Sequence, residues 1–143
     1  MNVSKKSIHL SFRLHKTYED FNGNEREDDF YFNLTKAELL ELELSEEGGM
    51  DKRLQRLVSS QDMKEAIKVF KFIVLKSYGI LTGDGKFIKS QEITNDFIHT
   101  AAYDEIFMEL ATDPEKANKF INGILPNMDR PSIPAPQLPN KHN

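Results

Sequence analysis

The stretch that most constrains the fold is an apolar segment in the middle of the chain, "DMKEAIKVFKFIVLKSYG". Its apolar residues recur at positions 63, 66, 67, 70, 73 and 74, which is the spacing of a helix and not of a strand. They also cover more than one stripe of that helix. The segment therefore predicts a central helix that is surrounded on several sides by the rest of the domain.

The length and composition favour one domain with one core. The chain has 143 residues, of which 38% are hydrophobic and 29% charged. A net charge of −4, with basic residues scattered among acidic ones, argues against a nucleic-acid-binding surface. The sequence shows neither a long apolar run nor the pattern of a signal peptide, so we expect a cytosolic protein with no membrane partner. The lack of cysteine agrees with a reducing compartment and removes thiolate chemistry.

The N-terminal part of the chain predicts a β-hairpin over residues 7–34. Residues 7–14, "SIHLSFRL", alternate strictly between apolar and polar side chains, as a half-buried strand does. A second apolar and aromatic run at residues 30–32 follows the turn-rich segment 19–29, and we expect the tip around residues 22–24. Because an isolated hairpin is only marginally stable in water, its apolar face must pack on another element.

Capping signals divide residues 35–124 into helices. Thr35 and Glu38 form a capping-box pattern at the start of "KAELLELEL", which ends at a Gly-Gly pair, and "MDKRLQRLV" predicts a further short helix. Ser90 begins one long helix or two abutting helices that reach about residue 111. Asp113 and the proline after it begin a last helix, because aspartate caps helices and proline is tolerated at the first helical position.

The C-terminal end has a different composition. From Pro126 onward the chain contains five of its six prolines and little apolar material, so we expect an extended, disordered tail. The predicted fold is α+β: an N-terminal antiparallel β-hairpin is followed by a mainly α-helical bundle. We assign residues 1–125 to this single domain and residues 126–143 to the flexible proline-rich tail.

The glycine-rich stretch "SYGILTGDGKFIKS" invites comparison with a phosphate-binding loop. Gly79 and Gly85 are separated by five residues instead of four, and Phe87 stands where the motif requires Ser or Thr. The preceding element is predicted to be a helix, whereas the motif follows a strand. Asp84 is the only carboxylate in the stretch, which also argues against a calcium loop. A nucleotide-binding regulator that uses residues 79–90 is kept only as a less favoured alternative.

We interpret the same stretch as a structural connection between two helices. Gly79 is expected to end the central helix in a left-handed conformation, and Asp84-Gly85 to form a turn. Tyr78 and Phe87 are expected to pack beneath the connection. Lys86 and Lys89 are expected only to face water on the outer side of the connection.

Nothing in the sequence requires catalysis. Two histidines are expected to face solvent on the first strand and a third lies in the tail: His9, His15 and His142. Glu92, Asp96 and His99 share one predicted helix face, but a dimetal site in a helical bundle needs a second carboxylate-histidine motif, and the chain has none. No G-x-S-x-G motif occurs. We therefore expect no enzyme, no cofactor and no metal site.

The helical part resembles a known family. The order "FNLTKAELLELE", a Gly-Gly break, an apolar helix ending in "LKSYG", "GDGKFIKS", "AYDEIFMEL" and "FINGILP" is similar to the tail assembly chaperones of long-tailed bacteriophages, over about residues 30–126. The resemblance implies a non-catalytic protein of the host cytoplasm that binds the tape measure protein and is absent from the finished virion. It also implies two further candidate partners, the tail tube protein and a longer product of ribosomal frameshifting.

The surface that would contact a partner is predicted on the helix after the hairpin. We expect Leu39, Leu42 and Leu44 to contact it, because Ala37 and Leu40 would suffice for the core face. Strand edges near residues 8–14 offer another route, in which a second copy of the chain extends the sheet. A structural tail component that stays in the particle is the alternative function.

Overall fold

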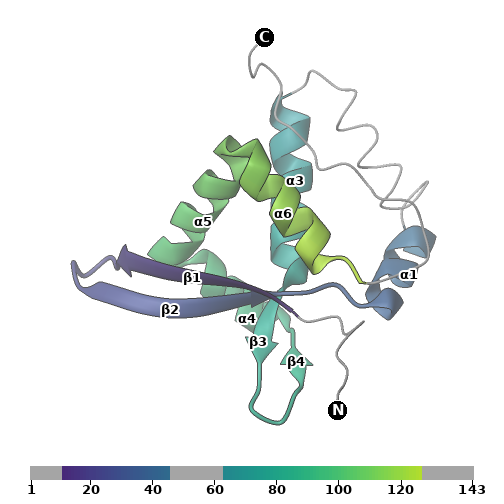
Figure 1. The fold of residues 1–143 in the computed structure, drawn as a ribbon, viewed down its shortest axis with the longest axis horizontal. Helices are drawn as coiled ribbons and strands as arrows, with labels where there is room; N and C mark the ends of the chain where they lie inside the picture. The colour runs from purple at the N-terminus through teal and green to yellow at the C-terminus, as the bar shows by residue number, and fades with distance from the viewer. Residues whose placement is uncertain (1–10, 46–62, 127–143) are drawn as a thin grey trace, which may run out of the picture.

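The computed structural model describes residues 11–45 and 63–126. These residues form four strands and five helices in the following order: β1 (Phe12–Glu19), β2 (Glu25–Phe32), α1 (Lys36–Ser45), α3 (Met63–Ser77), β3 (Tyr78–Leu81), β4 (Phe87–Ile88), α4 (Gln91–Ile98), α5 (Ala101–Thr112) and α6 (Pro114–Ile124) (Figure 1). The predicted α+β class, with an antiparallel hairpin before the helices, is confirmed. Residues 7–10, the predicted helix after residue 49 and residues 127–143 lie outside the described part, and the division into domain and tail stays a prediction.

The four strands form one antiparallel sheet in the order β1-β2-β3-β4. β1 and β2 pair along their whole length, from Phe12 opposite Phe32 to Glu19 opposite Glu25. β3 joins the far end of β2, where Gly79 lies opposite Tyr31. In Figure 1, α3, α5 and α6 lie on one side of the long hairpin, and β3 and β4 extend away from the other side.

The paired strands of the β1–β2 hairpin extend further toward the tip than predicted. Its tip lies where we expected it, since Gly23 adopts a φ of 85° and the Asp20 carboxylate accepts hydrogen bonds from two backbone N–H groups of the turn. The segment 19–29, however, is not mainly turn, because β2 already begins at Glu25. Its poor strand propensity is offset by cross-strand pairs: the Tyr18 hydroxyl, for example, donates to Asp28 at 2.8 Å.

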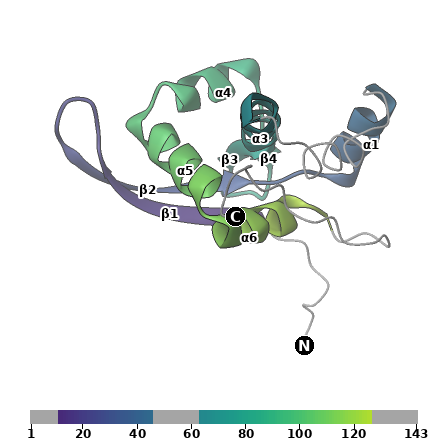
Figure 2. The same ribbon diagram turned by 90° about the horizontal axis from the view of Figure 1, so that it is seen from above.

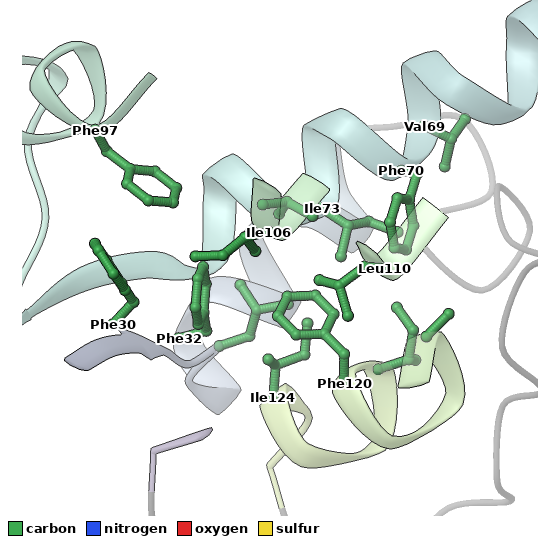
Figure 3. Packing of buried hydrophobic residues seen from close by; sticks show 14 of the residues in the cluster. Phe30, Phe32, Val69, Phe70, Ile73, Phe97, Ile106, Leu110, Phe120 and Ile124 are labelled. Atoms are coloured by element: carbon green, nitrogen blue, oxygen red, sulfur yellow. The ribbon is translucent and has the colours of Figure 1, made fainter. Parts of the chain in front are cut away.

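An aromatic cluster joins the sheet to the helices. Phe32 is fully buried, and its ring centroid lies 5.6 Å from that of Tyr78, 6.1 Å from that of Phe97 and 5.2 Å from that of Phe120. Tyr78 stacks on Phe97 with centroids 3.9 Å apart. Figure 3 shows such side chains converging from the sheet and from α3, α4, α5 and α6, with Ile106 among them. Each large side chain buried in this way stabilises the fold by about 1.5–3 kcal/mol.

The helices begin at the predicted caps. The Glu38 N–H donates to the Thr35 hydroxyl at 3.0 Å, and the Thr35 N–H donates to the Glu38 carboxylate at 2.9 Å, which completes the capping box. Ser90 and Asp113 cap α4 and α6 in the same manner. Thr100 caps α5, so residues 91–112 form two abutting helices and not one long helix.

The central helix α3 is less enclosed than predicted. It buries one face, which consists of Ala66, Val69, Phe70, Ile73, Val74 and Ser77. Met63 and Ile67 stay 40% and 38% exposed. The sequence shows how many apolar residues a helix carries, but the neighbours that cover them come from distant parts of the chain.

Candidate interaction surface

Helix α1 has apolar side chains on two faces. Leu39 and Leu42 are buried, whereas Leu40 is 61% and Leu44 is 80% exposed. The prediction that Ala37 and Leu40 fill the core face is wrong, since Ala37 is exposed as well. Leu39 and Leu42 are three positions apart and share a face of the helix, and so do Leu40 and Leu44 at four positions. The sequence alone therefore allowed either pair to point inward.

We call the exposed set Ala37, Leu40 and Leu44 the outer stripe of α1. These positions follow the i, i+3, i+7 spacing of one helix face. Of the three residues predicted to contact a partner, Leu44 lies on this stripe, while Leu39 and Leu42 belong to the core of the chain itself. Leu40 is the exposed leucine that sequence reasoning missed. Figure 2 shows α1 at the end of the molecule opposite the β1–β2 turn.

An ion pair attaches the start of α1 to the body of the domain. The Lys89 ammonium donates to both carboxylate oxygens of Glu38 at 2.9 Å and to the Asn33 carbonyl oxygen at 2.7 Å. Both charged side chains are largely shielded, with 20% of Lys89 and 23% of Glu38 exposed. The prediction that Lys89 only solvates a loop is wrong, because its partners lie more than 50 positions away in the sequence. Lys86, in contrast, is exposed.

The same contacts change the acidity of both groups. Burial disfavours the charged carboxylate, but hydrogen bonds from the Thr35 N–H and from Lys89 outweigh it and hold the pKa of Glu38 below its usual value. Burial lowers the pKa of Lys89, and Glu38 offsets this only in part. An open depression of about 440 Å³ lies beside this pair, between α1, α3 and α4. The ammonium at its edge is already bound by protein oxygens.

The glycine-rich stretch forms the β3–β4 hairpin. Gly79 lies inside β3, and among the glycines of the described residues only Gly23 and Gly85 have a positive φ. The predicted left-handed helix end at Gly79 is therefore wrong. Glycine is required there for space, because an added Cβ would lie 2.2 Å from the Phe87 ring and 2.9 Å from the Ile88 carbonyl oxygen.

The turn of this hairpin is stabilised by hydrogen bonds among its own residues. Gly85 has a φ of 88°, and its N–H donates to the Thr82 carbonyl oxygen at 3.1 Å. The Asp84 carboxylate accepts from the Thr82 hydroxyl, which lowers its pKa. Tyr78 stacks on the core, where burial raises its pKa, and Phe87 covers Gly79. The turn leads into β4 and not directly into a helix, so the backbone arrangement of a phosphate-binding loop is not formed.

The histidines of the described residues are bound within the chain. The exposed His15 ring lies between two carboxylates of β2, with Nδ1 2.6 Å from Asp29 and Nε2 2.7 Å from Glu27. The His99 ring bonds the Asn95 carbonyl oxygen. Within residues 11–45 and 63–126, no three His, Asp or Glu side chains are arranged to hold a metal ion. None of the helices in those ranges is long and apolar enough to cross a membrane.

Comparison with protein families decides the identity of the chain. A family model described as phage tail assembly chaperone matches residues 13–132. The chain belongs to the phage tail assembly chaperone family. The match confirms the predicted resemblance and extends it into β1. Searches of curated proteins and of solved structures each gave no match.

The chaperone exposes large apolar side chains on several described elements. They are Phe21, Leu40, Leu44, Met63, Ile67, Ile80, Leu81, Ile88 and Met108. Most stand singly or in pairs of partly covered residues, which is ordinary for a protein surface. On α1, two leucines that are more than half exposed lie one helical turn apart on the same face. Membership of this family indicates a role in tail assembly.

Proposed function

We propose that the chaperone binds the tape measure protein of its phage and keeps it soluble during tail assembly. The observation that carries this proposal is the exposed outer stripe of α1, in a chain that belongs to the tail assembly chaperone family. A helix that presents residues at i, i+3 and i+7 is a common means of binding another helix.

The physical demands on such a protein agree with this proposal. A long, apolar and helical client aggregates if its surface stays uncovered before the tube forms around it. The protein that covers it needs apolar contact area together with charge that keeps the complex in solution. A net charge of −4 on 143 residues supplies the second requirement. The chaperone acts in the host cell and, in this proposal, leaves before the virion is complete.

Three further partners remain predictions. They are the tail tube protein, a longer frameshift product and a second copy of the chaperone. Each of them can be sought by purifying the chaperone from infected cells, because a bound partner would co-purify with it.

Co-expression tests the proposed function directly. The tape measure protein of the same phage is produced with the chaperone or with an unrelated acidic protein of similar size. We expect a higher soluble yield and co-purification only with the chaperone. Equal solubility in both cultures would contradict the proposal. Mass spectrometry of mature particles is a second test, and we expect no chaperone in them; its presence would favour a structural tail component.

A further inference from the structure

Carboxylates lie on both sides of the outer stripe of α1. Successive residues of an α-helix are rotated by about 100°, so Glu41 lies on one side of Leu40 and Leu44, and Glu43 lies on the other. Both glutamates are exposed. The basic residue of α1, Lys36, stands at the opposite end of the helix, one residue after the cap.

The direction of the helix adds to this negative charge. The last turn of an α-helix carries partial negative charge on its carbonyl groups, which a basic residue normally balances. The last turn of α1 contains no basic residue, and Glu41 and Glu43 lie next to that end. The most exposed leucine of the stripe, Leu44, therefore lies in the turn of the helix that carries this partial negative charge.

The other exposed helical pair has the opposite surroundings. Met63 and Ile67 are four residues apart on α3, and each is followed by a lysine, at positions 64 and 68. The exposed pair on α3 therefore does not share the acidic border of α1. This difference gives the chaperone two apolar pairs that are matched in spacing and unlike in charge.

We propose that the outer stripe of α1 binds a cationic amphipathic helix of the client. Apolar residues of that helix lie along Leu40 and Leu44, and its lysines or arginines pair with Glu41 and Glu43. The charges set the choice of segment and its orientation, while the leucines supply most of the affinity. This inference rests on the proposed function, because it names the kind of client segment that the chaperone recognises.

Two synthetic helical peptides test the charge preference. Both carry leucines at i, i+3, i+4 and i+7; one has lysines and the other glutamates beside them. Each is titrated into the full-length chaperone at low salt and the binding is followed by fluorescence anisotropy. We expect the lysine peptide to bind at least about tenfold more tightly, and the difference to shrink at about 0.5 M salt. Equal affinities at low salt would overturn the proposal.

Variants locate the binding surface. We expect Leu40→Ser/Leu44→Ser to weaken binding of the lysine peptide at least about tenfold, because two apolar contacts are lost. The matched control on α3, Met63→Ser/Ile67→Ser, should bind as the original chain does. The charge reversal Glu41→Lys/Glu43→Lys should make the glutamate peptide the better ligand. Loss of binding in the α3 variant alone would place the surface elsewhere.

Co-expression with the tape measure protein separates this inference from the proposed function. If the unmodified chaperone raises the soluble yield and Leu40→Ser/Leu44→Ser raises it equally, the surface is wrong and the function stands. If the unmodified chaperone has no effect, the function itself fails. Size-exclusion chromatography of the same variant completes the test. If the original chain is a dimer, the variant is a monomer, and both bind the peptide with the same affinity, then the stripe binds a second copy and the proposal is overturned.

Discussion

The aromatic cluster and helix α1 show two ways of holding an element in place. Phe32, Tyr78 and Phe97 are packed by neighbours from the sheet and from several helices. Helix α1 is attached at its start by a capping box and the Glu38–Lys89 ion pair, while its outer stripe stays uncovered. The difference shows that α1 contributes its inner leucines to the core and keeps a second apolar face uncovered, which in our proposal binds the partner.

Removing the centre of the aromatic cluster is the largest expected disturbance. We expect Phe32→Ala to lower the free energy of unfolding by about 3–5 kcal/mol, because a fully buried ring leaves a cavity. Urea denaturation followed by circular dichroism measures this. The control Leu44→Ala, on the outer stripe, should change it by less than about 0.5 kcal/mol. Similar losses for both would remove the distinction between the two regions.

Filling the space at Gly79 is expected to cause the next largest loss of stability, and it also acts on the packed part of the domain. We expect Gly79→Ala to cost about 1–3 kcal/mol, because the Ile88 carbonyl oxygen and the Phe87 ring must move. Gly83→Ala is the matched control in the same hairpin, since an added Cβ there meets no atom within 4 Å. Thermal melting of both variants gives the difference. A neutral Gly79→Ala would show that β3 and β4 separate easily.

Breaking the attachment of α1 should have a moderate effect. Glu38→Gln keeps an oxygen for the Thr35 N–H but leaves Lys89 without its counter-charge. We expect a loss of about 1–2 kcal/mol, because both side chains are largely shielded from water but not fully buried. The pKa of Glu38 is lowered in the folded state, so this contribution is present above its unfolded value and disappears as the pH falls through the folded one. The difference in melting temperature between the variant and the original chain should therefore shrink as the pH is lowered from 7 to 3. Lys86→Gln, at an exposed pair, is the control and should be neutral.

The smallest effect on stability is expected from the contacts of His15, on the exposed face of the long hairpin. Hydrogen bonds that the ring donates to the Asp29 and Glu27 carboxylates raise the pKa of His15 above 6.5. The stabilising contribution of the imidazolium is therefore complete below pH 6.5 and is lost as the pH rises through the raised value. An NMR titration of the ring should give a midpoint above 6.5, and Asp29→Asn should move it down. A midpoint that does not change in Asp29→Asn would show that this pair is not formed in solution.

Local signals in the sequence predicted the starts of the helices well. Thr35, Ser90 and Asp113 act through hydrogen bonds to residues two or three positions away, so their roles can be inferred from a short window. The hairpin tip at Gly23 is local in the same sense. We inferred the class of the fold from the predicted elements, and the family from the order of the sequence segments that resemble it.

Features that depend on distant residues were not predictable in this way. The space around Gly79 is taken by a ring from the next strand, and Lys89 is bound by oxygens that lie more than 50 positions earlier. The inward face of α1 is a clear case. Both leucine pairs satisfy helical spacing, and only the packing of the complete domain decides that Leu39 and Leu42 point inward.

The Glu38 carboxylate has a mechanical consequence. It accepts from the Thr35 N–H at the start of α1 and from Lys89, which immediately precedes the cap of α4. The N-termini of α1 and α4 are thus both held by the Glu38 side chain. Glu38 thereby connects α1 to α4, whose Phe97 ring stacks on Tyr78. A substitution of Glu38 is therefore expected to loosen α1 and the start of α4 together.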